Sequence, residues 1–243
     1  MITFASIPLR GITMLKRVHL LLVVLIGLTA ASACSADGAS AGASAGATAR
    51  QWVSGTDYTV IDPPVPTSTG SKIEVVEVFS YACPHCAHFQ TYIDELKSKL
   101  PANAQFVLLP AVFNAAWEPF ARAFYTAQAL GLVDKTHQAL FDALHRDHLP
   151  ITSMDALAKF YAGYGADSAT FLSTANSFVI EAKLAHGNDL VRDYHVEGTP
   201  TLIVNGKYRV AMNSERSIGP AEAIKLTLYL VQQEAQAKGK AGK

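Results

Sequence analysis

Two cysteines separated by two residues, Cys83 and Cys86, lie between a predicted strand and a predicted helix. The apolar run Ile73–Phe79 is typical of a buried strand, and residues 87–100 have helical periodicity. Pro84 suits the first turn of a helix, where its missing N–H leaves no hydrogen bond unmade. The chain must therefore place both sulfur atoms at the N-terminal end of a helix that follows a buried strand.

The start of a helix favours an ionised thiol. The first backbone N–H groups of a helix have no intrahelical partners, and the macrodipole adds partial positive charge there. A Cys83 thiolate would be stabilised, so the thiol pKa falls and the sulfur becomes a nucleophile and a good leaving group. Cys86 lies one turn further along, so the two sulfurs can form a disulfide. A purely structural disulfide is the competing interpretation, but so small a ring stabilises a fold weakly. The motif therefore predicts redox chemistry.

The N-terminus has the features of a secretory signal peptide. Basic residues precede an apolar run at positions 20–28, which is too short to span a bilayer comfortably. Ala31-Ser32-Ala33 matches a cleavage site. We therefore predict a signal peptide at residues 1–33, with translation starting at Met1 or Met14. An uncleaved membrane anchor is the alternative.

Cys34 directly follows this cleavage site, and residues 34–50 are mostly Ala, Gly and Ser. Such a composition is typical of a flexible tether. The region resembles a bacterial lipoprotein box, in which the cysteine is lipidated, although Ala31 stands where that motif usually has a large apolar residue. Two interpretations remain open: a protein tethered to a membrane through lipidated Cys34, or a soluble protein with a flexible N-terminal tail.

The composition excludes some partners. The 243 residues carry no net charge, so nothing indicates a nucleic acid or an anionic membrane surface. Residues 51–243 suffice for one domain, or for one domain with an insertion. The three cysteines are at positions 34, 83 and 86, so the predicted folded region contains a single cysteine pair.

The order of the predicted elements indicates an α/β fold. A short strand at 57–61 precedes the cysteine motif, and another at 105–109 follows its helix. Asn205-Gly206 predicts a tight hairpin, and Gly219-Pro220 begins a last helix. The residues between have helical patterns. This is the order of a thioredoxin-like fold with an inserted helical domain at about 114–194.

Local signals divide this helical block. Thr152 with Asp155 resembles a helix-capping arrangement, and Asp167 can cap a short helix. Gly187 predicts a kink in a helix at 177–194.

The sequence is similar to the periplasmic thiol:disulfide interchange proteins of the DsbA family over roughly residues 55–235. The segments that carry the resemblance are 77–86, Ala129-Leu130-Gly131, Gly198-Thr199-Pro200 and 204–208. The resemblance implies that the helical block is the family's insertion domain, and that the protein oxidises reduced secreted proteins by donating its own Cys83–Cys86 disulfide. It also implies no other cofactor, a monomeric periplasmic protein, and recharging by a quinone-linked membrane partner of the DsbB type.

Each position of the cysteine motif has an expected role. Cys83 is the exposed, nucleophilic sulfur, and Cys86 is the poorly solvated, resolving one. Pro84 begins the helix. His85 lies between the cysteines, where a cation favours the Cys83 thiolate and makes the disulfide more oxidising. A solvated helix residue is the alternative reading of His85.

Pro200 must lie at a strand start or a bulge, because central strands exclude proline. By resemblance it is the family's cis-proline, facing the cysteine pair; an ordinary trans turn is the alternative. The backbone of Thr199 could then pair with an extended substrate chain, which recognises peptide without reading its sequence.

Glu77 interrupts the apolar run before the cysteines, and a carboxylate buried there costs free energy unless it is paired or protonated. By resemblance it is the family's buried acid below Cys86, able to accept and return that thiol's proton. The alternative is a solvated edge position. The best-known members place a basic residue in the next strand, where this chain has only uncharged residues at 106–110. Glu77 is therefore neutral, paired from elsewhere, or solvated by water.

Three functions remain in competition. A dithiol oxidase is favoured by Pro84-His85 between the cysteines. An isomerase or reductase would share the fold, but nothing resembling a dimerisation domain precedes it. A metal-binding or scaffolding module would need four zinc ligands, of which a single pair of cysteines supplies two. The remaining histidines share no metal-ligand spacing with the cysteines, so no metal site is predicted.

Overall fold

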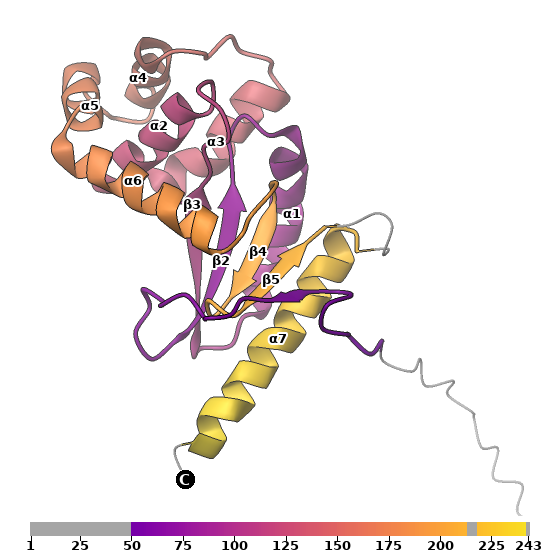
Figure 1. Ribbon diagram of the computed structural model, residues 1–243. Coiled ribbons are helices and arrows are strands. Elements are labelled where there is room, and N and C mark those ends of the chain that lie inside the picture. The colour runs from indigo at the N-terminus through magenta and orange to yellow at the C-terminus, as the bar shows by residue number, and fades with distance from the viewer. Residues whose placement is uncertain (1–49, 213–217, 242–243) are drawn as a thin grey trace, which may run out of the picture. The chain divides into compact units, whose positions relative to one another are not determined.

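The computed structural model of the protein describes residues 50–212 and 218–241 (Figure 1). The predicted signal peptide at 1–33, Cys34 and the tether up to residue 49 lie outside the described residues.

The described strands form one five-stranded sheet in the order β1-β5-β4-β2-β3 (Figure 1). The inner strand β2 (Ile73–Phe79) pairs in parallel with the edge strand β3 (Ala104–Pro110) and antiparallel with β4 (Thr201–Val204). β5 (Tyr208–Ala211) and the edge strand β1 (Thr59–Val60) complete the sheet, both with antiparallel pairing. All seven residues of β2 are buried, as the apolar run predicts for a strand with both faces covered.

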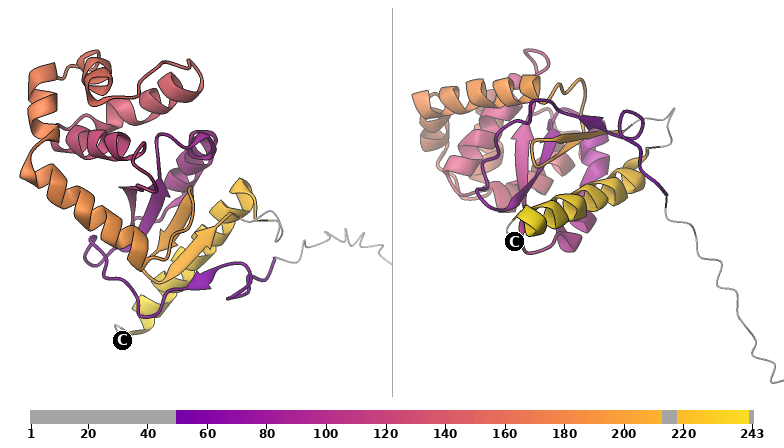
Figure 2. Two further views of the ribbon diagram at one scale, coloured as in Figure 1. Left: turned by 45° about the horizontal axis from the view of Figure 1, so that its top comes forward. Right: turned by 60° about the horizontal axis from the view of Figure 1, so that its bottom comes forward.

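Helices cover both faces of this sheet. α1 (Pro84–Lys99) and α7 (Pro220–Ala241) pack on the face that carries Val75, and α6 (Phe178–Asp193) packs on the opposite face (Figure 2). Because successive side chains of a strand point to opposite faces, Glu77 points to the same side as Val75, towards α1.

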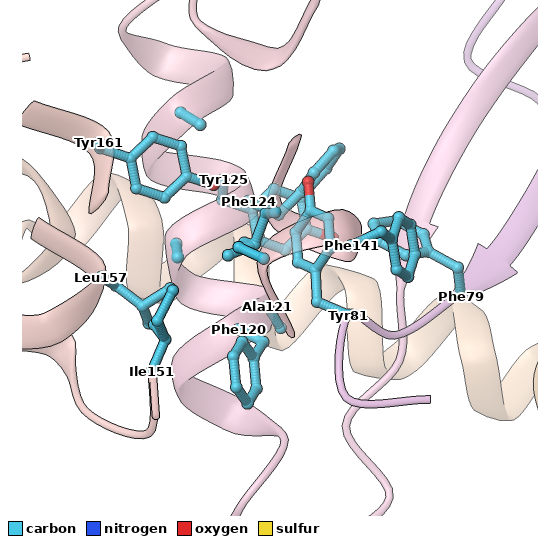
Figure 3. Close-up of a cluster of buried hydrophobic side chains, with 14 of the residues drawn as sticks. Phe79, Tyr81, Phe120, Ala121, Phe124, Tyr125, Phe141, Ile151, Leu157 and Tyr161 are labelled. Carbon is cyan, nitrogen blue, oxygen red and sulfur yellow. The ribbon is translucent and has the colours of Figure 1, made fainter. Parts of the chain in front are cut away.

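Between β3 and β4 the described chain forms five helices. They are α2 (Glu118–Ala129), α3 (Val133–His145), α4 (Met154–Ala162), α5 (Ser168–Ala175) and α6. Their apolar faces form a second buried cluster, which includes Phe124 and Phe141 (Figure 3). Phe79, at the end of β2, and Tyr81 belong to the same cluster. The helical block is therefore packed directly against the segment that leads into the cysteines.

The helix caps follow the local signals with one correction. Asp167 caps α5 as expected, and its carboxylate accepts a hydrogen bond from the N–H of Thr170 at 2.8 Å. The cap of α4 is Ser153 and not Thr152, because α4 begins at Met154 and the capping residue is the one directly before the helix.

Gly187 allows close packing of α6. The helix continues without interruption across this glycine. A Cβ atom there would lie 2.3 Å from the hydroxyl of Tyr125 on α2. The absence of a side chain at Gly187 therefore allows α6 to approach α2.

The hairpin turn forms at Asn205 and Gly206, which both have positive φ, at 53° and 66°. Positive φ at both positions explains why the turn uses asparagine and glycine, which adopt this conformation more readily than other residues. α7 anchors the turn, because the carboxylate of Glu234, only 3% exposed, accepts hydrogen bonds from Asn205, Lys207 and Tyr208.

Candidate active site

Both cysteines lie at the junction that the sequence predicts. Cys83 is the N-cap of α1, and Pro84 is the first residue of that helix. The two thiols are free, so the structure is that of the reduced form. Cys83 is 5% exposed and Cys86 is fully buried. Cys83 is thus the more accessible sulfur, but it is far less exposed than we expected.

The surroundings of Cys83 favour its thiolate and lower the pKa of the thiol from 9.0 to about 5. The largest contribution is a hydrogen bond from the thiol of Cys86; burial acts in the opposite direction. The side chain of Thr199 and the backbone N–H groups of Cys86 and His85 add further hydrogen bonds. Cys83 is therefore ionised at neutral pH.

His85 contributes a backbone N–H to the Cys83 thiolate, while its side chain is exposed to solvent. The role expected of a charged His85 side chain stays a prediction. Any residue other than proline would provide the same N–H, since every helix start presents unpaired N–H groups.

Cys86 has the opposite tendency. Burial is the main reason that the pKa of its thiol is raised far above the usual value, and its hydrogen bond to Cys83 adds to the effect. In the reduced form Cys86 therefore holds its proton and donates it towards the Cys83 thiolate. In the reduced form Cys83 is therefore the charged sulfur and Cys86 the neutral one.

Thr199 and Pro200 lie against the cysteines. The bond between them is cis, and Cys83, as a thiol, donates to the carbonyl of Thr199 with 3.5 Å from sulfur to oxygen. The hydroxyl of Thr199 is buried and has no hydrogen-bond partner among the described residues, so it is available to donate to the Cys83 thiolate. The fold thus brings together two segments that are 116 positions apart.

Glu77 is completely buried on the side of β2 that faces α1, so the solvated edge position is wrong. Its oxygen Oε1 accepts a hydrogen bond from Nε2 of Gln90 at 3.0 Å. Burial, opposed by Gln90 and by the charge of Lys97, raises the pKa of the carboxyl from 4.5 to about 8. Glu77 is therefore mainly neutral at pH 7, which was one of the three states left open.

Gln90 connects the buried acid to the cysteine helix. Its Nε2 also donates to the carbonyl of Cys86, at 3.3 Å. Because Oε1 of Glu77 accepts from Gln90, the carboxyl proton belongs on Oε2, which has no partner among the described residues. We did not identify Gln90 from the sequence. The available signal was an amide side chain one helical turn after Cys86, on the face of α1 that carries Phe89 and Ile93.

A groove of about 1000 Å³ lies beside the cysteine motif. His85, His88 and Tyr92 of α1 form one wall, and Thr199 and Pro200 are part of the lining. The groove can therefore hold a segment of extended chain beside His85 and Pro200.

Two further classes of site are absent from the described part of the chain. Residues 50–212 and 218–241 contain no group of three or more His, Cys, Asp or Glu side chains placed to bind a metal ion. No helix in the same ranges has the length and apolar character needed to cross a membrane.

Comparisons with known proteins agree with this geometry. Residues 74–225 match the model of the DSBA-like thioredoxin domain family. The thiol:disulfide interchange protein DsbA of Pseudomonas aeruginosa is 41% identical over 194 residues, which are 80% of this chain and 91% of that protein. The protein of the same name from Azotobacter vinelandii is 36% identical over 184 residues, 76% of this chain and 85% of that protein.

Solved structures give the same result. The crystal structure of Pseudomonas aeruginosa DsbA superposes with a TM-score of 0.72 at 40% identity, covering 77% of this chain and 97% of that one. The oxidoreductase DsbA from Xylella fastidiosa superposes with a TM-score of 0.71 at 37% identity, covering 76% and 98%. The chain belongs to the DSBA-like thioredoxin domain family.

Proposed function

We propose that this protein is a thiol:disulfide oxidoreductase that introduces disulfide bonds into reduced secreted or periplasmic proteins by donating its Cys83–Cys86 disulfide. The observation that carries the proposal is the opposite tendency of the two sulfurs. The helix start and its hydrogen bonds lower the pKa of Cys83 to about 5, while burial keeps Cys86 protonated. A pair that is this stable in the dithiol form gives up its disulfide readily.

The reaction proceeds in two exchanges. A substrate thiolate attacks Sγ of Cys83, the bond between Cys83 and Cys86 breaks, and a mixed disulfide forms on Cys83. The sulfur of Cys86 leaves with the electron pair and takes up a proton. A second substrate thiolate then attacks the substrate sulfur, and Cys83 leaves as the stabilised thiolate. The substrate loses two electrons and the cysteine pair gains them.

Glu77 is the proposed proton donor for Cys86. The departing Cys86 thiolate is buried, so its charge would be costly without a nearby proton. The neutral carboxyl of Glu77 carries that proton on Oε2, and Gln90 holds the carboxyl next to the helical turn of Cys86. Protonated Glu77 thereby makes Cys86 a feasible leaving group.

Thr199 and the groove are the proposed substrate site. The groove is lined by His85 of the cysteine motif and by Thr199, whose carbonyl oxygen lies 3.5 Å from the sulfur of Cys83, so an extended peptide there would bring its cysteine to Cys83. Backbone pairing with Thr199 would accept many sequences, which suits an enzyme with many substrates.

The location and partners of the protein follow from the same proposal. Residues 1–33 are the proposed signal peptide, and residues 34–50 a tether that begins at Cys34, lipidated or free. The helices at about 114–194 are the proposed insertion domain. The protein acts in the periplasm as a monomer, and a quinone-linked membrane protein of the DsbB type restores its disulfide.

The buried acid leads to a prediction on stability. Glu77→Gln should stabilise the fold increasingly as the pH rises. The folded pKa of Glu77, about 8, lies above its ordinary value of 4.5. Between these two pH values the unfolded chain ionises Glu77 while the folded chain keeps it protonated, so the wild type loses stability as the pH rises. The variant should exceed the wild type by a few kcal/mol above about pH 8 and match it most closely below about pH 4.5. Urea unfolding of both oxidised proteins across this range measures the difference. A difference that does not change with pH would contradict the assignment.

The hydroxyl of Thr199 leads to a second prediction. Thr199→Val keeps the shape of the side chain and removes one hydrogen bond to the Cys83 thiolate, so the pKa of Cys83 should rise by up to about one unit. The pH dependence of alkylation of the reduced protein gives this pKa. Thr126→Val is the matched control, because its buried hydroxyl bonds to the carbonyl of Arg122, away from the site. The same Cys83 pKa in both variants would show that the hydroxyl of Thr199 does not stabilise the thiolate.

A further inference from the structure

One face of α3 contacts the segment that leads into the cysteines. His137, Phe141 and His145 are spaced four residues apart, so they lie on the same face of the helix. All three contact Tyr81, two positions before Cys83. Tyr81 is itself almost fully buried, at 1% exposure.

The contacts hold both the side chain and the backbone of Tyr81. Nδ1 of His137 lies 2.9 Å from the Tyr81 hydroxyl, and the ring of Phe141 lies 5.0 Å from the Tyr81 ring, centre to centre. Nε2 of His145 lies 2.7 Å from the Tyr81 carbonyl oxygen. A carbonyl can only accept, so Nε2 of His145 carries a hydrogen and donates it.

The held segment controls the groups around both sulfurs. The backbone N–H of Cys83 donates to the carbonyl of Ser80 at 3.0 Å, which closes the turn in front of α1. The backbone N–H of Ser80 is among the donors that face the sulfur of Cys86. Tyr81 lies inside this turn, so a shift of its carbonyl would move the Ser80 donor at Cys86 and would move Cys83 relative to its own donors. Strong hydrogen bonds to a thiolate depend on such placement.

We propose that the α3 clamp, defined as His137, Phe141 and His145, is a positioning element that tunes the redox pair, with His145 as its central residue. The clamp fixes the turn from Ser80 to Cys83 at the angle that gives the Cys83 thiolate its hydrogen bonds. The helical block therefore sets the chemistry of the cysteines in addition to packing against them. The proposal rests on Cys83 being the attacking sulfur of the proposed function.

The test compares two substitutions of His145. His145→Leu removes the N–H that holds the Tyr81 carbonyl, whereas His145→Gln places an amide N–H the same number of bonds from the backbone. In His145→Leu the pKa of Cys83 should rise, and the equilibrium with glutathione should shift by about threefold or more towards the protein disulfide. His145→Gln should recover most of both changes. Alkylation against pH and equilibration in glutathione buffers give the two readouts.

Two controls separate positioning from packing. His186→Leu removes an exposed histidine of α6, and Glu234→Ala lowers stability far from the cysteines, through the anchor of the hairpin. Neither should change the pKa of Cys83. Tyr81→Phe is a second test variant, which keeps the proposal testable if His145→Leu does not fold. It keeps the ring, removes only the hydroxyl that meets His137, and should also raise the pKa of Cys83.

The outcomes are distinct. A pKa and a glutathione equilibrium that remain at wild-type values in His145→Leu and Tyr81→Phe would overturn the clamp and leave α3 as packing alone. An ordinary thiol pKa for Cys83 in the wild-type protein would instead overturn the proposed function itself.

Discussion

Cys83→Ser is expected to abolish the oxidation of a reduced test protein. The proposed reaction transfers the substrate sulfur onto Cys83 and later releases Cys83 as a thiolate. A serine hydroxyl can form no disulfide, and Cys86 is fully buried at the helix and cannot replace the missing sulfur. The loss should be complete within the sensitivity of an assay that follows recovery of activity of a reduced, disulfide-dependent enzyme.

Cys86→Ser is the matched control, because it leaves Cys83 in place. This variant can still exchange with a disulfide and form a mixed disulfide at Cys83, but it cannot resolve it internally. Non-reducing gels should therefore show trapped adducts for Cys86→Ser and none for Cys83→Ser. Normal oxidation by Cys83→Ser, or adducts that depend on Cys86, would show that the roles of the two sulfurs are assigned wrongly.

The reduced protein is expected to be more stable than the oxidised protein at mildly alkaline pH, and less stable at acidic pH. The folded pKa of Cys83 is lowered from 9.0 to about 5, so the thiolate contributes stability that is fully present above 9.0 and is lost as the pH falls to about 5. At pH 8 this contribution is about 4 kcal/mol by direct conversion, and solvent screening reduces it to about 3.

The disulfide stabilises the oxidised protein, and its contribution must be compared with that of the Cys83 thiolate to the reduced protein. A ring of four residues constrains the unfolded chain by about 2 kcal/mol, with no dependence on pH. The reduced protein is therefore the more stable form at pH 8, and the oxidised protein is the more stable form near pH 5. Denaturant unfolding of both redox forms at several pH values should show the difference changing by up to about 1.4 kcal/mol per pH unit between these limits. A difference that stays constant with pH would exclude a stabilised Cys83 thiolate.

Much of the fold can be predicted from the sequence because its signals are local. The apolar run of β2, the Asn205-Gly206 turn and the capping residue Asp167 each specify their structure within a few positions. The structure has β2 as a buried inner strand of the sheet, both turn residues at positive φ, and Asp167 at the start of α5. The cysteine motif is of the same kind, since Cys83 must lie at a helix start once β2 and α1 are recognised.

The parts that were missed depend on contacts between distant segments. His137 and His145 looked unremarkable in the sequence, because their partner Tyr81 lies 56 and 64 positions away. The low exposure of Cys83 likewise requires the segment of Thr199, which is far along the chain.

Glu77 illustrates the limit most clearly. The sequence shows a carboxyl in an apolar strand, and it allowed three states for that group. The complete burial of the side chain favours the neutral state, and it outweighs the hydrogen bond from Gln90, which acts in the opposite direction. The sequence has no charged residue in the next strand to pair with Glu77, and the amide of Gln90 is its hydrogen-bond partner instead.

The reduction potential of the Cys83–Cys86 pair tests the central claim most directly, because it measures the stability of the reduced pair against the disulfide. Equilibration of the protein with glutathione buffers of known ratio, followed by trapping of free thiols, gives the midpoint. A stabilised Cys83 thiolate predicts a midpoint far more oxidising than the value of about −270 mV for thioredoxin, so the disulfide should be reduced even by weakly reducing glutathione mixtures. A midpoint close to that of thioredoxin would contradict the account and would identify the protein as a reductase of the same fold.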